Sequence, residues 1–105
     1  PLWLTPDQFV ILPISDKYND YAANICSEFR VKGMRGSVDT RAEKTGRKIR
    51  DAELKKIPYI LVVGEKEQAE GTVAVRKHGG VDMGTMPKAD FISHLNEEID
   101  KEINK

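Results

Sequence analysis

One segment constrains the fold of this chain more than any other: Pro58 separates a basic stretch from the apolar run Tyr59–Val63. Because proline cannot continue a helix, the basic stretch, residues 47–56, is predicted to be a helix that ends before it and lies on the surface with its charged side toward solvent. The run that follows is apolar on both faces, which is typical of a central strand covered on both sides. Charged residues, Glu67 among them, come directly after this strand. Ligands of open α/β sheets bind beyond the carboxyl ends of strands, so these charges mark a candidate binding site.

The remaining pattern predicts strands alternating with helices. Strands are expected at 9–14, 35–39, 72–76 and, briefly, 81–86; helices are expected at 19–32 and from 87 to the end, with a charged turn at 64–71. The fold class is therefore predicted to be α/β: a three-layer α/β/α sandwich with a mixed sheet of about five strands and three helices. Right-handed crossovers should make the first three strands parallel.

Length and composition indicate one soluble domain. The chain has 105 residues, of which 39% are hydrophobic and 32% charged, which argues against disorder. No apolar run approaches the roughly 20 residues that cross a bilayer, so no membrane contact is expected. A single cysteine, Cys26, cannot form an internal disulfide and fits the reducing cytoplasm. Residues 1–7, which lack an initiator methionine, are interpreted as the remnant of an inter-domain connection, and residues 8–105 as the domain.

The charge of the chain is unevenly distributed. The formal net charge is zero, but residues 41–56 hold seven basic and three acidic residues, whereas residues 90–105 hold five acidic residues and two lysines. Such a local field can steer an anionic ligand although the total is zero. The alternative is an ordinary solvated helix face rich in lysine and arginine.

Catalytic chemistry finds little support in the sequence. Cys26 lies on the apolar face of the first predicted helix, where a buried, unreactive thiol is expected. His78 and His94 have no partner at the spacing of metal ligands. The glycines match neither a phosphate loop nor a dinucleotide fingerprint. We therefore predict no catalytic residue and no metal site, and a flavodoxin-like or thioredoxin-like enzyme is the weaker alternative.

A binding site is better supported. Glu67 and Arg76 flank one turn, so we expect both to project from one edge of the sheet. An unpaired guanine presents the acceptors O6 and N7 beside the donors N1–H and N2–H. An arginine can satisfy the first pair and a carboxylate the second, so the two residues could read a guanine. The alternative is a surface ion pair.

A longer pattern of residues resembles the C-terminal anticodon-binding domain of threonyl-tRNA synthetases, which are class II aminoacyl-tRNA synthetases. It comprises Trp3-Leu4-Thr5-Pro6 with Gln8, Val38-Asp39 with Arg41, Glu43-Lys44 with Gly46 and Lys48-Ile49-Arg50, Ile57-Pro58-Tyr59, Val63-Gly64 with Lys66-Glu67, Gly71-Thr72-Val73-Ala74-Val75-Arg76, and Gly84-Thr85-Met86. Related domains occur in the prolyl, histidyl and glycyl enzymes.

The resemblance implies a set of site residues. Those that correspond to anticodon-contacting positions are Glu67, Arg76, Lys44 and Arg41; those expected to contact phosphates are Lys48, Arg50 and Lys77. The family commonly has Arg-Asn-Glu-Lys where this chain has Arg41-Ala42-Glu43-Lys44. Because a methyl group can neither donate nor accept a hydrogen bond, the contact of that asparagine is missing here or supplied elsewhere.

The resemblance also implies a function. The parent ligase activates threonine with ATP and Mg²⁺ and transfers it to tRNA, and its ATP, Mg²⁺ and Zn²⁺ sites belong to a part absent from this chain. The present domain is expected to be non-catalytic, to bind the anticodon stem-loop of tRNA(Thr), and to contact its own catalytic domain. The full-length protein is expected to be a homodimer and this fragment a monomer. The alternative is a stand-alone accessory or regulatory RNA-binding domain.

Overall fold

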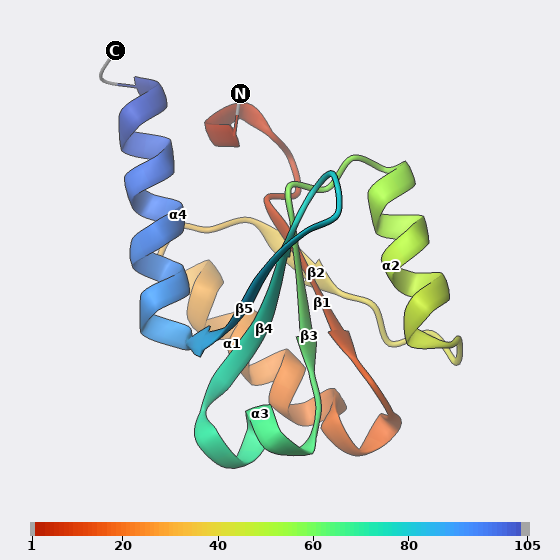
Figure 1. Cartoon of the computed structure of the whole chain (residues 1–105). Helices are drawn as coiled ribbons and strands as arrows, with labels where there is room; N and C mark the ends of the chain where they lie inside the picture. The colour runs from red at the N-terminus through yellow and green to blue at the C-terminus, as the bar shows by residue number, and fades with distance from the viewer. Residues whose placement is uncertain (1, 104–105) are drawn as a thin grey trace.

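The computed structural model describes residues 2–103 and contains a five-stranded sheet with four α-helices in that range (Figure 1). The elements are η1 (Leu2–Leu4), β1 (Phe9–Pro13), η2 (Asp16–Tyr18), α1 (Asn19–Val31), β2 (Gly36–Val38), α2 (Thr45–Leu54), β3 (Tyr59–Val63), α3 (Glu65–Glu70), β4 (Thr72–Lys77), β5 (Val81–Pro87) and α4 (Lys88–Ile103). The sheet order is β2-β1-β3-β4-β5. The predicted α/β class and the mixed sheet of five strands are confirmed.

The strand directions follow the prediction. β1 pairs in parallel with both β2 and β3, whereas β4 is antiparallel to β3 and to β5. β3 occupies the centre of the sheet, and four of its five residues are buried. This position explains why the run Tyr59–Val63 is apolar on both faces.

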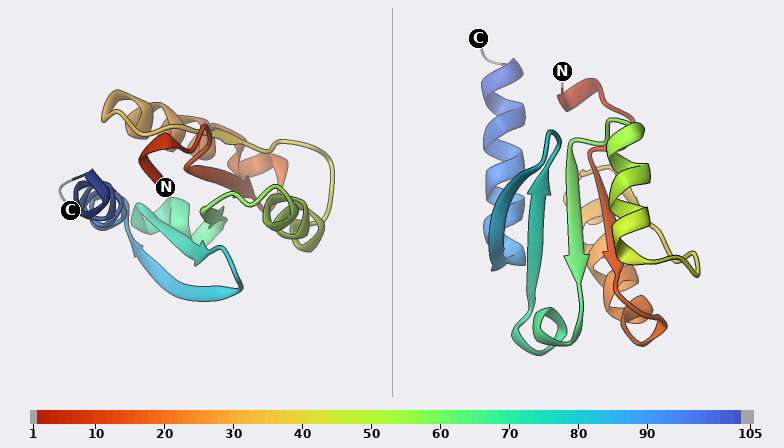
Figure 2. Two further views of the ribbon diagram at one scale, coloured as in Figure 1. Left: turned by 90° about the horizontal axis from the view of Figure 1, so that it is seen from above. Right: turned by 45° about the vertical axis from the view of Figure 1, so that its right-hand side comes forward.

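Two apolar clusters lie on opposite faces of the sheet. The larger cluster joins β1, β3 and β4 to α1 and α4 and includes three phenylalanines, Phe9, Phe29 and Phe91. The smaller cluster comprises Val10, Leu12, Ala52, Ile57 and Ile60 and holds α2 against β1 and β3. Figure 2 shows that α2 stands apart from α1 and α4, and that within residues 2–103 no helix covers β4 and β5 on the α2 face. This open part of the sheet is accessible to a ligand.

The segment 64–71, predicted to be a turn, contains the helix α3, so the described part of the chain has four α-helices where three were predicted. The Gly64 N–H donates to Glu67 Oε1 at 2.8 Å, and the Gln68 N–H donates to the Gly64 carbonyl at 2.9 Å. The helix ends at Gly71, whose φ of +70° is left-handed, as is common after a helix. Glycine has no side chain, so Glu67 alone provides the side-chain cap.

Other boundaries differ by a few residues. α2 begins at Thr45 and ends at Leu54, whereas 47–56 was predicted. Pro87 ends β5 and does not lie in the first turn of α4. Both differences are of the size expected for helix ends, where propensity is weak and packing decides.

The described part of segment 1–7 packs against the end of α4. Leu2 is 7% exposed and belongs to the larger apolar cluster, and its backbone N–H donates to Glu102 Oε1 at 3.0 Å. The buried side chain of Gln8 donates from Nε2 to the Leu2 carbonyl at 3.2 Å and accepts from the Arg35 N–H at 2.9 Å. Residue 1 and residues 104–105 lie outside the described range, and the division into a connection and a domain stays a prediction.

Candidate functional site

The sheet has a topological switch point at β1. From β1 the chain passes through α1 to β2 on one side, and it later passes through α2 to β3 on the other. Crevices for ligands form beyond the carboxyl ends of strands at such points. A hollow of about 420 Å³ lies there. The end of β1 and the segment after it form one wall, with Pro13, Ile14, Ser15, Asp16 and Asn19; the loop before α2 forms the other, with Arg41, Ala42, Glu43 and Lys44, and Lys48 also lines the hollow.

Two carboxylates engage the Arg41 side chain, which was predicted to line the anticodon pocket. Its Nε lies 2.9 and 3.2 Å from the two carboxylate oxygens of Asp39, and its Nη2 lies 2.8 Å from Asp39 Oδ2 and 2.9 Å from Asp51 Oδ2. These hydrogen bonds, to Asp39 first and then to Asp51, raise the pKa of Arg41. The hydrogen bond from Arg41 lowers the pKa of Asp39. Arg41 therefore holds the loop to α2.

Lys48 is buried. Its side chain lies on the sheet side of α2, only 4% of the residue is exposed, and Nζ donates to the Asp39 carbonyl at 2.9 Å. The prediction that α2 turns its charged side to solvent is wrong for this residue. Because its ammonium group is already engaged inside the protein, Lys48 is not placed for the phosphate contact that we expected.

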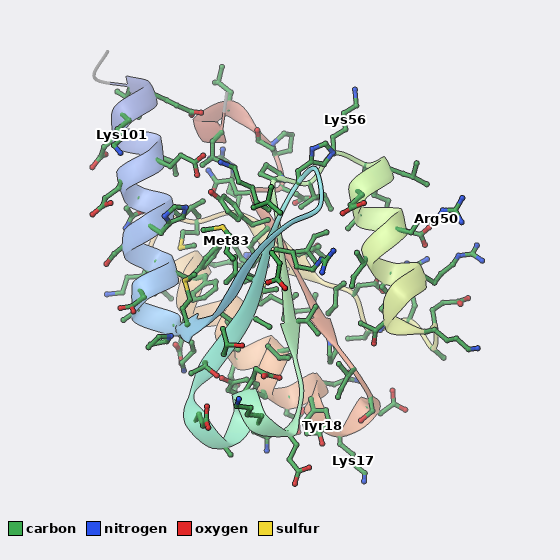
Figure 3. All side chains as sticks on the ribbon, in the orientation of Figure 1. Lys17, Tyr18, Arg50, Lys56, Met83 and Lys101 are labelled. Atoms are coloured by element: carbon green, nitrogen blue, oxygen red, sulfur yellow. The ribbon has the colours of Figure 1, made fainter. Side chains whose placement is uncertain are left out.

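Two further predicted site residues, Lys44 and Arg50, are exposed, and Lys44 lines the crevice. Lys44 occupies the N-cap position of α2, and Arg50 projects from α2 away from the sheet (Figure 3). Within residues 2–103 neither makes an ion pair. Arg47, which was not among the predicted site residues, is also exposed, with Nε 3.8 Å from Asp51 Oδ2. The sequence could have identified Arg47, because it lies three residues before Arg50 and the helical period places both side chains on one face of the helix.

Lys77 lies apart from this group. β4 runs antiparallel to β3, and Lys77 pairs with Tyr59 at the start of β3. Lys77 therefore lies at the end of the strands that is opposite the crevice. Its Nζ is 3.5 Å from Glu98 Oε1, so α4 partly neutralises its charge. The structure therefore does not bring Lys77 together with Lys44 and Arg50.

Glu67 and Arg76 do not project from one edge, and the prediction that they would is wrong. Arg76 pairs with Ile60 near the start of β3, whereas Glu67 follows the end of β3 at Val63. At about 3.3 Å per residue, the three residues from Ile60 to Val63 separate the two positions by about 10 Å along the strand. The antiparallel direction of β4 carries its last residues back to the far end of β3.

Both residues nevertheless keep unused hydrogen-bonding groups. Arg76 shares the α2 face with Ile60, on the open part of the sheet, and its Nε is buried without a hydrogen-bond partner among the described residues. Glu67 uses Oε1 to cap α3 and keeps Oε2.

Two searches of the described residues concern metal ions and membranes. Within residues 2–103 there is no group of three or more His, Cys, Asp and Glu side chains that could hold a metal ion. In the same range the helices are too short or too polar to cross a membrane.

Comparison with known proteins decides the family. Residues 8–98 match the family model of the anticodon binding domain. The chain belongs to this family. It is 55% identical over 103 residues to the threonine–tRNA ligase of Cytophaga hutchinsonii and 57% identical over 105 residues to that of Phocaeicola vulgatus, covering 98% and 100% of this chain. The resemblance to threonyl-tRNA synthetases is confirmed, although the chain spans only 16% of the length of each of these relatives.

Solved structures agree with this assignment. The RNA-binding domain of threonyl-tRNA synthetase from Cryptosporidium parvum Iowa II has a TM-score of 0.87 and 30% identity, covering 92% of this chain and 24% of that chain. Histidyl-tRNA synthetase from a Nostoc strain has a TM-score of 0.82 at 16% identity, covering 90% of this chain and 23% of that chain, and supports the fold alone.

Proposed function

We propose that this domain binds the anticodon stem-loop of tRNA(Thr) as part of a threonine–tRNA ligase. The observation that carries the proposal is the match over 98–100% of the chain to threonine–tRNA ligases at 55–57% identity. The crevice at the switch point and the open face of β4 and β5 supply the surface on which an RNA loop would lie.

The activity of the whole protein belongs to this proposal, because the chain spans 16% of its relatives. A full-length ligase would activate threonine with ATP and Mg²⁺ and transfer it to tRNA, with ATP, Mg²⁺ and Zn²⁺ held by the part outside this chain. We assign it to the cytoplasm and expect a homodimer whose catalytic domain contacts the present one. This domain would place the tRNA so that its acceptor end reaches the distant active site.

The exposed cations suit the RNA backbone. Arg50 would contact phosphates, which orients the stem-loop without reading its sequence and makes binding dependent on salt. Arg47 would join Arg50 from the same helix face. Lys44, at the wall of the hollow, stays a proposed contact of the anticodon. Lys77 stays a predicted phosphate contact of the opposite edge, where an RNA stem would have to extend along the sheet to reach it.

Arg76 and Glu67 suit the bases. Threonine anticodons share guanine at the middle position and uracil at the third. Arg76 would donate to O6 and N7 of guanine on the open face, and Glu67 would accept from a base N–H at the carboxyl edge. Because about 10 Å of strand separates the two residues, we propose that they contact neighbouring bases of a splayed-out anticodon.

Competition between stem-loops that differ only at the middle base tests this assignment. We expect Arg76→Ala to lower the preference for the cognate stem-loop by about ten- to a hundredfold, because a bidentate contact gives about 1–3 kcal/mol of discrimination. Glu67→Gln is tested by a second competition, between stem-loops that differ only at the base beside the guanine, and should lower that preference by a similar factor. Its amide oxygen can still accept from the Gly64 N–H, so α3 is preserved.

Glu65→Gln is the matched control, because it removes the same charge from an exposed position of α3. It should leave the preference unchanged. If each folded variant, Arg76→Ala and Glu67→Gln, keeps the wild-type preference in its own competition, neither residue contacts a base as proposed. Failure of the wild-type chain to bind any stem-loop at low salt would overturn the proposed function itself.

A further inference from the structure

We infer that Asp51 is a positioning residue for RNA recognition: through Arg41 it holds the loop of residues 39–44 at the crevice and does not itself touch RNA. The inference rests on the proposed function, because the loop forms one wall of the hollow that we assign to the anticodon. It is carried by a connected set of contacts between this loop and α2.

The first part of the set is the fork of Arg41. Its Nη2 lies between two carboxylates, 2.8 Å from Asp39 Oδ2 and 2.9 Å from Asp51 Oδ2, while its Nε is shared by both oxygens of Asp39. Its backbone N–H also donates to Asp39 Oδ1 at 3.1 Å. Arg41 therefore joins the end of β2 to the middle of α2, and Asp51 is the only residue of α2 in the described range that makes an ion pair with it.

The second part of the set fixes the two ends of the loop. Lys48 Nζ donates to the Asp39 carbonyl at 2.9 Å from a buried position, and the Lys48 N–H donates to the Lys44 carbonyl at 3.1 Å. Between these anchors the Glu43 N–H donates to the Arg41 carbonyl at 2.8 Å. With its ends held by Lys48 and its middle held through Arg41, the loop presents Ala42, Glu43 and Lys44 to the hollow.

Isolated surface ion pairs contribute little, but this arrangement differs from one. The carboxylates are largely covered, with side-chain exposures of 16% for Asp39 and 24% for Asp51, and Arg41 contacts Asp39 through two of its nitrogens. Bidentate, charge-assisted pairs are stronger and directional, so they can select one loop conformation. A loop held in its binding conformation before the ligand arrives does not lose that ordering entropy on binding.

The sign of one mutational effect separates positioning from electrostatics. Asp51 places a negative charge beside a site proposed to bind a polyanion. If charge alone mattered, its removal would tighten RNA binding, and the freed Arg41 could add a phosphate contact. If Asp51 positions the loop, its removal weakens binding although the site becomes more positive.

The test compares Asp51→Ala with Glu53→Ala, a matched control that removes the same charge from the same helix, where Glu53 makes no ion pair among the described residues. The dissociation constant for the threonine anticodon stem-loop is measured at several salt concentrations. We expect Asp51→Ala to weaken binding by about five- to tenfold, the scale of one charge-assisted contact. The salt slope should stay unchanged, Asp51→Glu should restore most of the affinity, and Glu53→Ala should bind as well as the wild type or slightly better.

Amide hydrogen exchange of the free protein supplies the second readout. Residues 40–44 should exchange faster in Asp51→Ala and not in Glu53→Ala. Binding by Asp51→Ala that equals or exceeds the wild type overturns the inference, as does a lower melting temperature with unchanged affinity, which indicates a role in stability only. If the wild-type chain does not bind the stem-loop, the proposed function fails first, and the inference fails with it.

Discussion

At Lys48 a residue from the most basic stretch of the chain has become part of the interior. Its stem lies between α2 and the sheet, and its ammonium group donates to the Asp39 carbonyl at 2.9 Å. Long basic side chains can bury their methylenes in this way when the charged group finds a partner. The neighbouring Arg50 carries the same charge on the solvent side and remains available to a ligand.

Replacing each of these two residues by glutamate should therefore separate an effect on folding from an effect on binding. Lys48→Glu places a carboxylate beside a carbonyl in a buried site, and we expect it to lower the free energy of unfolding by about 3 kcal/mol or more. Arg50→Glu should change it by no more than about 0.5 kcal/mol and should weaken all stem-loops alike. Urea unfolding and stem-loop titration measure the two effects; equal stability of both variants would contradict the burial of Lys48.

The sequence contained a signal for this burial that charge counting overlooked. Lys48 lies four residues before Ala52, so the helical period puts both on one face, and Ala52 is 4% exposed. Residue type predicted the exposure of Lys44 and Arg50 correctly. It could not show that Arg41 is engaged by Asp39 and Asp51, because that contact depends on how α2 packs beside the end of β2.

At the scale of elements, the edge strand β2 depends on a close approach between the backbone of Gly36 and the ring of Phe9 in β1. A Cβ at Gly36 would lie 2.5 Å from three ring atoms of Phe9, whose residue is fully buried. The Phe9 ring in turn packs edge-on against Phe29, with 5.4 Å between ring centroids. Gly36 interrupts the apolar pattern of the strand, but glycine is required there because the Phe9 ring occupies the space of a side chain.

Two glycine-to-alanine substitutions should consequently act in opposite directions. We expect Gly36→Ala to destabilise the fold by about 1–3 kcal/mol, as overpacking does in a close-packed core. Gly46→Ala, in the first turn of α2 with nothing within 4 Å of the new Cβ, should stabilise it by about 0.5–1 kcal/mol. Thermal unfolding measures both shifts. The same sign for both variants would show that helix and strand propensity matter here more than packing.

The elements that the sequence predicted well are those with a clear period or an unbroken apolar run: β1, β3, α1 and α4. α3 was missed because its six residues, five of them polar, lie between two glycines and show no amphipathic period. The signal that remained was the pair Gly64 and Gly71 around residues of good helix propensity. The prediction that Glu67 and Arg76 share one edge of the sheet was wrong, because it did not take into account that the antiparallel strand β4 runs back along β3.

At the scale of the whole molecule, the helices cover the two faces of the sheet unequally. α1 and α4 lie over one face, whereas α2 alone lies over β1 and β3 on the other (Figure 2). The element order predicted three layers, but it could not predict which strands would stay open. The open strands carry Arg76, whose Nε has no hydrogen-bond partner within residues 2–103 and which we propose reads a guanine, so the uneven cover connects the fold to the proposed RNA site.

A polar network joins the last helix to the centre of this sheet. The hydroxyl of the buried Tyr59 in β3 donates to Glu98 Oε2 of α4, and its oxygen lies 3.0 Å from His94 Nε2. Glu98 also forms an ion pair with Lys77 of β4. Burial first, and then the hydrogen bond to Glu98, raise the pKa of Tyr59 well above its usual range. α4 is thus held to two strands by groups that keep a tyrosine neutral.

This arrangement predicts how stability depends on alkaline pH. A raised pKa in the folded state gives stability that is fully present below about pH 10, the tyrosine pKa in an unfolded chain, and is lost as pH rises above it. The wild-type free energy of unfolding should therefore begin to fall near pH 10 and keep falling as the pH rises toward the raised pKa of the folded state. Tyr59→Phe should cost about 1 kcal/mol near neutral pH and should make that fall shallower, because the folded state no longer resists this ionisation. Urea unfolding across this pH range measures both effects. Equal slopes for the two proteins would show that Tyr59 is not the group that titrates. The half-buried Tyr21, whose hydroxyl donates to the Thr72 carbonyl at 2.8 Å, also has a raised pKa, caused mainly by burial.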